Sequence, residues 1–284
     1  MIAWTAVAVS ALGFAPLAKK MALTGGVATL PVAFVTALVS AVLAGGWLIA
    51  RRKGATLRAM NRRQRMAVLL VGALGTGLVP LLGILAMTVT TASNRALFQS
   101  AYPAATAVAA RLLLGERFRA LTYGLIALVC AGLVLVNLES NSDIRLGWPF
   151  WLLFATLPLI GLSDVIAKRS LEDVSPEVVA VGRALGGTLI LALALPWFLP
   201  ELFEGVVRAW PWLLAAGACM GVFAVALYQV FDHTEASIAA SLIALAPLLT
   251  LALEALTLGV QLSALQWAGF VLVLAAILAL ARRA

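Results

Sequence analysis

Four ionisable side chains fall inside long apolar stretches of the chain, where such groups are rare: Arg95, Asp164, Arg183 and Glu254. An unpaired charge inside a bilayer costs several kcal/mol, so each needs a partner, a water-filled cavity or access to the headgroups. We predict that Arg95 pairs with Glu254 at the outer end of a cavity and that Asp164 pairs with Arg183 at the inner end. Static structural pairs, or side chains that snorkel to the membrane surface, are the alternative for all four.

The fourth apolar stretch carries the densest set of polar side chains. Arg95, Gln99 and Tyr102 recur at spacings of four and three residues, which places them on one face of a helix. Polar side chains are unfavourable against lipid, so this face is predicted to line a cavity, with polar helix–helix packing as the alternative. The predicted substrate-binding residues are Asn94, Arg95, Phe98, Gln99, Tyr102, Asp164, Tyr228, Gln229 and Glu254.

No residue pattern for catalysis or metal binding emerges from the sequence. It has no zinc-binding His-Glu-His pattern, no Gly-x-Ser-x-Gly nucleophile turn and no phosphate-binding loop before a helix. We therefore predict that the protein is not an enzyme and uses no cofactor or metal. Cys130 and Cys219 lie in apolar stretches and are predicted to be buried thiols. Gly72, Gly75 and Gly77 resemble part of a dinucleotide fingerprint, but no strand precedes them, so close helix packing is predicted instead.

The composition excludes a soluble fold. Of the 284 residues, 63% are hydrophobic and 11% are charged, with a mean hydropathy of +1.07. Soluble domains are closer to half apolar and a quarter charged. Apolar runs of about 20 residues recur along the chain, which predicts an all-α integral membrane protein. The net charge of +8 comes largely from one short loop, residues 51–65, and predicts lipid headgroup contact rather than nucleic-acid binding.

Ten transmembrane helices are predicted, arranged as two five-helix repeats over residues 1–140 and 141–284. The predicted spans are 2–18, 29–50, 66–87, 92–113, 119–138, 149–168, 177–199, 210–231, 236–256 and 262–281. The repeat is visible at an offset of 144, where Pro103 corresponds to Pro247 and Gly115 to Gly259. Such internal repeats are typical of secondary transporters.

Basic residues predict the orientation of the spans. Placing both termini in the cytoplasm puts fourteen Lys and Arg residues of the loops and ends inside and four outside. Positive loops favour the cytoplasmic side, so we predict that both termini are cytoplasmic. Five spans per repeat then give the two repeats opposite topology, which makes them an inverted pair.

These features resemble the drug/metabolite transporter superfamily, and within it the ten-span EamA-type transporters. The resemblance covers the whole chain and is carried by Gly161 to Lys168, Ser175-Pro176, Arg183, Ala92, Pro103 and Leu114-Gly115-Glu116. One departure is the second Leu-Gly ending, where Val260 stands in place of the glutamate. The resemblance implies alternating access through a cavity between the halves, and transport of small organic solutes without an ATPase.

Together these patterns predict a multi-pass secondary transporter of the bacterial inner membrane. It is expected to export small polar metabolites, such as amino-acid-like or zwitterionic solutes. The alternatives are a flippase for a lipid-linked amino-sugar or another lipid headgroup and, from a different class, a non-transporting membrane scaffold. The expected partners are a small-molecule substrate and membrane lipid, with no nucleic acid. A monomer can suffice, because one chain contains both repeats.

Overall fold

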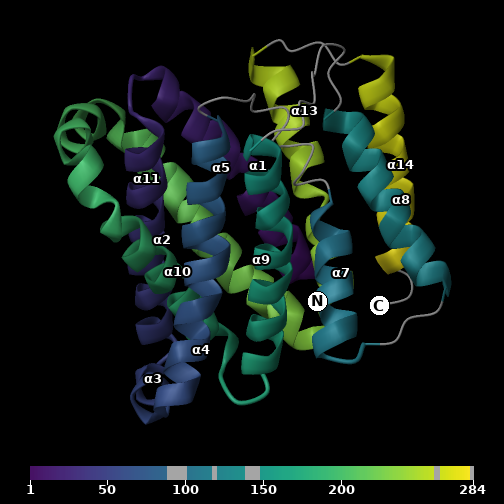
Figure 1. Cartoon of the computed structure of the whole chain (residues 1–284), viewed down its shortest axis with the longest axis horizontal. Coiled ribbons are helices and arrows are strands. Elements are labelled where there is room, and N and C mark those ends of the chain that lie inside the picture. Colours follow the sequence, from purple (N-terminus) through teal and green to yellow (C-terminus); the bar gives the residue numbers. More distant parts are fainter. Residues whose placement is uncertain (88–100, 117–119, 138–147, 259–262, 282–284) are drawn as a thin grey trace. The chain divides into compact units, whose positions relative to one another are not determined.

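A computed structural model describes residues 1–87, 101–116, 120–137, 148–258 and 263–281, and all regular structure in these ranges is helical (Figure 1). Helices satisfy their backbone hydrogen bonds internally, as apolar surroundings require. The helices are α1 (Ile2–Thr24), α2 (Thr29–Ala50), α3 (Gly54–Ala59), α4 (Arg62–Gly72), the π-helix η1 (Ala73–Leu78), α5 (Val79–Met87), α7 (Tyr102–Leu113), α8 (Ala120–Asn137), α9 (Trp148–Ser170), α10 (Pro176–Leu193), α11 (Leu195–His233), α12 (Ala236–Ile243), α13 (Ala246–Leu258) and α14 (Ala264–Ala281).

Six helical segments in the described ranges are long and apolar enough to cross a membrane. They are Ile2–Thr24, Thr29–Ala50, Arg62–Gly83, Phe150–Ser170, Pro176–Leu193 and Val206–His233. Shorter apolar helices cover 120–135, 236–250 and 264–280. The predicted all-helical class is confirmed for the described residues, whereas the number of ten spans and the cytoplasmic location of both termini stay predictions.

The first of two compact units comprises Met1–Leu81 and Ile166–His233, and α10 lies at its centre. Helix α10 packs against α2, α4, η1 and α11, and α11 also packs against α1 and α2. A Cβ on Gly72 would lie 2.0 Å from the Arg183 carbonyl oxygen, and one on Gly186 would lie 2.0 Å from that of Leu69. The α4 and α10 backbones therefore touch, which confirms the predicted close packing at Gly72.

The second unit comprises Leu82–Val165 and Thr234–Ala284. Helix α8 packs along α14, and α7 packs against α8 and α12. The α8–α14 contact is again made possible by a glycine, since a Cβ on Gly132 would lie 2.6 Å from a methyl carbon of Val273. Both units combine segments from the two halves of the chain, and the predicted division into repeats at residue 140 stays a prediction.

Two predicted spans are broken or cut short near a proline. The span predicted over 236–256 is not continuous, because α12 ends at Ile243 and α13 begins at Ala246. Pro247 explains the break, since it has no N–H to continue the helix and suits the first turn of a new one. The span predicted over 177–199 ends early at Leu193, and Pro196 lies in the first turn of α11 for the same reason.

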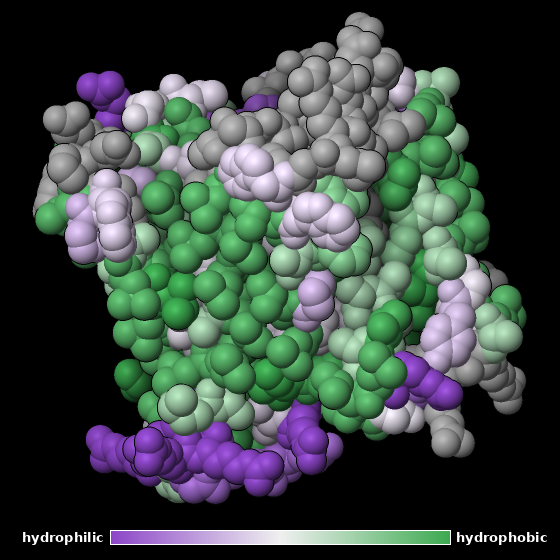
Figure 2. All heavy atoms as spheres, in the orientation of Figure 1, coloured by the Kyte–Doolittle hydropathy of each residue, from purple (hydrophilic) through white to green (hydrophobic). Residues whose placement is uncertain are grey.

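The surface of the first unit separates apolar from hydrophilic residues. Figure 2 shows its flank covered by hydrophobic side chains, with hydrophilic ones gathered at the end where α3 and the start of α4 lie. This end contains the basic loop of residues 51–65. Asn61 caps α4 there, because its side chain accepts a hydrogen bond from the Gln64 N–H while the Gln64 side chain accepts one from the Asn61 N–H.

Candidate functional site

A pocket of about 100 Å³ lies among the helices of the first unit. Its polar lining comes from four elements: Lys19 of α1, Thr36 and Ser40 of α2, Thr76 of η1 and Arg183 of α10. The other lining residues are apolar or glycine, and no acidic residue is among them within the described part of the chain. The pocket is therefore a small, positively charged compartment in helices of membrane-spanning length.

Arg183 is fixed beside this pocket by two hydrogen bonds. Its Nε donates to Thr76 Oγ1 at 3.1 Å, and its Nη1 donates to Tyr228 Oη at 3.0 Å. The guanidinium carbon also lies 5.7 Å from the centre of the Phe223 ring and 5.9 Å from that of Tyr228. Such cation–π contacts strengthen away from water. Because Tyr228 is 0% exposed, these contacts hold the guanidinium within the unit rather than at its surface.

The π-helix η1 explains how Thr76 reaches Arg183. π-Helical turns are rare in proteins. Those that occur are often at functional sites, because the wider turn redirects side chains. Gly75 and Thr76 of η1 both line the pocket. Gly77 has the packing role that the sequence predicted, since a Cβ there would lie 2.6 Å from Ile190 Cβ of α10. Gly75 lines the pocket, and its predicted packing role stays a prediction.

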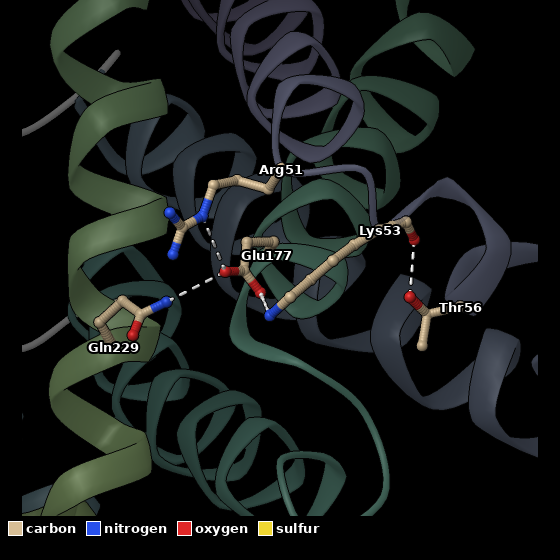
Figure 3. A network of polar contacts seen from close by, with 5 residues as sticks. All are labelled: Arg51, Lys53, Thr56, Glu177 and Gln229. Carbon is tan, nitrogen blue, oxygen red and sulfur yellow. Dashed lines mark hydrogen bonds and ion pairs between the residues drawn. The ribbon is translucent and has the colours of Figure 1, made fainter.

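A second polar cluster lies at the start of α10 and was missed by the sequence analysis (Figure 3). Glu177 is 1% exposed, and Lys53 donates to its Oε2 at 2.8 Å. Arg51 lies 4.0 Å from Oε1, and Gln229 donates to the same oxygen at 3.4 Å. The carboxylate thus connects the basic loop to α10 and α11. The available signal was the Ser-Pro-Glu sequence, which places an acid in a first helical turn, in a chain whose 51–65 loop carries seven basic residues.

In the second unit Asp164 is buried, with 2% of its surface exposed. It accepts a hydrogen bond from Thr106 Oγ1 at 2.9 Å. Gly161 permits this approach, since a Cβ there would lie 2.8 Å from the Ala105 carbonyl oxygen. Asp164 and Arg183 belong to different units, and their predicted pairing stays a prediction.

Glu116 of the second unit caps α12 across a long sequence separation. Its Oε1 accepts from the Ala236 N–H at 3.0 Å, and its Oε2 accepts from Ser237 Oγ at 2.9 Å. The first N–H groups of a helix have no acceptor within the helix, so the carboxylate satisfies one of them and also complements the helix dipole. The residue at the matching repeat position is Val260, which has no oxygen to offer. The cap is therefore specific to one of the two repeats.

Replacing Glu116 by alanine is expected to lower the free energy of unfolding by about 1–2 kcal/mol, because both cap bonds are lost. Glutamine should cost less, because its single carbonyl oxygen still accepts one bond. Thermal unfolding of the purified protein in detergent measures both effects. Glu172, an exposed acid, provides the matched control. Equal midpoints for Glu116→Ala and Glu172→Ala would show that the cap contributes nothing.

The remaining predicted site residues divide into two groups. Asn94, Arg95, Phe98 and Gln99 lie outside the described residues, and Glu254 lies in α13 with a side chain that is not described. Tyr102 begins α7 and is partly buried. The structure thus brings together Arg183 with Tyr228, and Gln229 with Glu177. The predicted Arg95–Glu254 pair stays a prediction.

Comparison with known proteins places this arrangement in a family. A solved structure described as "Crystal structure of protein" is similar, with a TM-score of 0.82 and 18% sequence identity over 98% of this chain and 94% of that chain. At this identity the likeness concerns the fold. No curated protein matches the chain. The model of the EamA-like transporter family matches residues 1–138 and again residues 147–282. Since these matches cover nearly the whole length, this multi-pass membrane protein belongs to the EamA-like transporter family, within the drug/metabolite transporter superfamily.

Proposed function

We propose that this chain is a secondary transporter of small polar metabolites, with amino-acid-like or zwitterionic solutes as its substrate class. The pocket of the first unit carries the proposal. Two cations and three hydroxyls line it, although the surrounding helices are apolar enough to cross a membrane. Ionisable groups at such positions are costly, and their usual role is in a solute or ion pathway.

Alternating access is the mechanism that we propose for this solute. The family model matches once in each half of the chain, as expected for a protein in which one repeat moves against the other. The chain breaks between α12 and α13, just before Pro247, and α13 begins at Ala246, which corresponds in the repeat to Tyr102, the first residue of α7. Interrupted helices of this kind expose backbone acceptors near the middle of a membrane. We propose export as the direction and the bacterial inner membrane as the location.

A counterflow screen in liposomes tests the transport proposal. The purified protein is supplied with labelled amino acids, amines, nucleosides and short sugars. We expect saturable exchange of one class, reduced about tenfold or more by Glu254→Gln, since loss of an intramembrane charge removes a costly and functional group. Glu172→Gln changes an exposed acid in the same way and is expected to exchange normally.

Two other outcomes would each point to an alternative function. Exchange of no water-soluble class, together with flipping of a labelled amino-sugar lipid, would identify a lipid headgroup flippase. Silent alanine substitutions at Arg95 and Glu254, with neither exchange nor flipping, would indicate a non-transporting scaffold. Loss of exchange on each single swap, Arg95→Glu and Glu254→Arg, with rescue in the double swap, would support the proposed outer charge pair.

A further inference from the structure

We propose that Lys19 and Arg183 form the subsite that binds the anionic group of the transported solute, a carboxylate or a phosphate. This inference rests on the proposed function and adds the chemical class that the pocket selects. It assigns no role to residues outside the first unit.

The charge of the lining is the first argument. The two side chains of the lining that carry charge are both basic, among the residues that the structure describes. The cluster around Glu177 differs, because there a buried carboxylate lies against the cations of the basic loop. A compartment that provides cations and hydroxyls in apolar surroundings attracts an anion strongly, since the local dielectric constant is low.

The second argument is the preorganisation of Arg183. Its bonds to Thr76 and Tyr228 and the rings of Phe223 and Tyr228 fix the plane of the guanidinium. A planar guanidinium held in place loses little entropy on binding, and its fork of N–H groups matches the two oxygens of a carboxylate or phosphate. Lys19 contributes from a different helix as a compact charge with three donors. Arg183 therefore orients the anion through its N–H groups, and Lys19 adds a second positive charge.

The hydroxyls indicate which groups bind the anion directly. Thr36 donates its hydroxyl proton within α2, to the carbonyl oxygens of Val32 at 2.8 Å and Ala33 at 3.0 Å. A hydroxyl that already donates to the backbone can accept but not donate to a ligand. Direct donation to an anion thus falls to the two basic side chains and to Thr76, whose hydroxyl accepts from Arg183 and retains its own proton to donate. Ser40, one turn further along the same helix face, has the other hydroxyl of α2 in the lining.

The size of the pocket limits what the subsite holds. Its volume of about 100 Å³ is well below the range of about 300–1,000 Å³ that is typical of drug-sized ligand pockets. It is several times the roughly 30 Å³ that one water occupies in the liquid. A carboxylate or phosphate group fits this space, while the remainder of a metabolite lies beyond it.

Anion titrations of the purified protein in detergent test the proposal without requiring transport. Thermal stabilisation is followed with acetate, inorganic phosphate, methylammonium and acetamide at constant ionic strength in chloride. We expect acetate or phosphate to stabilise the protein, and methylammonium and acetamide to have no effect. Lys19→Gln and Arg183→Gln should each weaken the apparent affinity about tenfold or more, because a charge-assisted bond is lost. Acetate and phosphate in separate arms identify which anionic group the site prefers.

Lys20→Gln is the matched control, since it removes the same charge from the adjacent, exposed position of α1. It should titrate as the native chain does. If Arg183→Gln does not fold, Lys19→Gln and the conservative Arg183→Lys still test the proposal. Arg183→Lys keeps the positive charge but lacks the paired N–H groups of the guanidinium. Absence of anion stabilisation in the native protein, or equal affinities in Lys19→Gln and Lys20→Gln, would overturn the subsite. Saturable counterflow of a cationic or uncharged solute in such a case would leave the transporter assignment intact.

Discussion

Replacing Gly186 with alanine is expected to be among the most damaging single-methyl changes in the chain. The new Cβ would lie 2.0 Å from the Leu69 carbonyl oxygen and 2.9 Å from the Ala73 nitrogen. These are backbone atoms, which no rotamer change can move, so α4 and α10 must separate. Overpacking usually lowers the free energy of unfolding by about 1–3 kcal/mol. Because the new Cβ meets backbone atoms here, we expect a loss at or above the upper end of this range. The separation would also displace Arg183 from Thr76, because α10 carries the first and η1 the second.

Thermal unfolding of Gly186→Ala measures the loss of stability, and anion titration measures the displacement of Arg183. Gly72→Ala should behave in the same way, since its Cβ would lie 2.0 Å from the Arg183 carbonyl oxygen. Gly45 and Gly46 of α2 are the matched controls, because a Cβ at either position has no neighbour within 4 Å. Alanine there is expected to be neutral or to stabilise slightly, as it favours helix over glycine. A native unfolding midpoint for Gly186→Ala would contradict the close contact between α4 and α10.

The helices were largely predictable because the apolar runs that define them are long and uninterrupted. The predicted 29–50 span matches α2, and the predicted start at residue 210 falls next to Ala209, whose φ of −116° and ψ of 17° interrupt α11. Composition alone cannot locate a break inside an apolar run. The interruption before Pro247 therefore falls inside a stretch that the apolar pattern predicts as one continuous span.

The site was only partly predictable, and the reason is physical. Arg183 stands out in a sequence because an isolated charge within an apolar run is costly. Its partners do not stand out, since Thr76 lies 107 positions away and reaches it through a π-helical turn that no periodicity signals. Glu177 does not stand out either, because an acid at the end of a span usually lies at the surface, whereas here it is 1% exposed. Lys19 lies beyond the predicted 2–18 span, whereas α1 continues to Thr24 and places Lys19 in the pocket lining.

Lys53→Met is expected to lower the free energy of unfolding more than Glu177→Gln does, although Lys53 is the more exposed residue of the pair. Lys53→Met would remove the 2.8 Å partner of a carboxylate that is 1% exposed, and the contacts to Arg51 and Gln229, at 4.0 Å and 3.4 Å, are longer. An under-satisfied buried charge costs about 1–3 kcal/mol or more. Glu177→Gln instead leaves Lys53, whose side chain is 39% exposed, able to turn toward water. Its cost should stay below about 1 kcal/mol, as for a solvent-exposed ion pair.

The double variant Lys53→Met with Glu177→Gln distinguishes this account from simple additivity. With no charge left to satisfy, it should unfold at a higher temperature than Lys53→Met alone, although it carries one substitution more. Such a coupling is expected between groups in direct contact or in one hydrogen-bond network. Arg58→Met, at an exposed position in the same loop, controls for the loss of one basic charge. If Glu177→Gln proved more destabilising than Lys53→Met, the carboxylate would stabilise the protein through its own hydrogen bonds with α11 rather than through the basic loop.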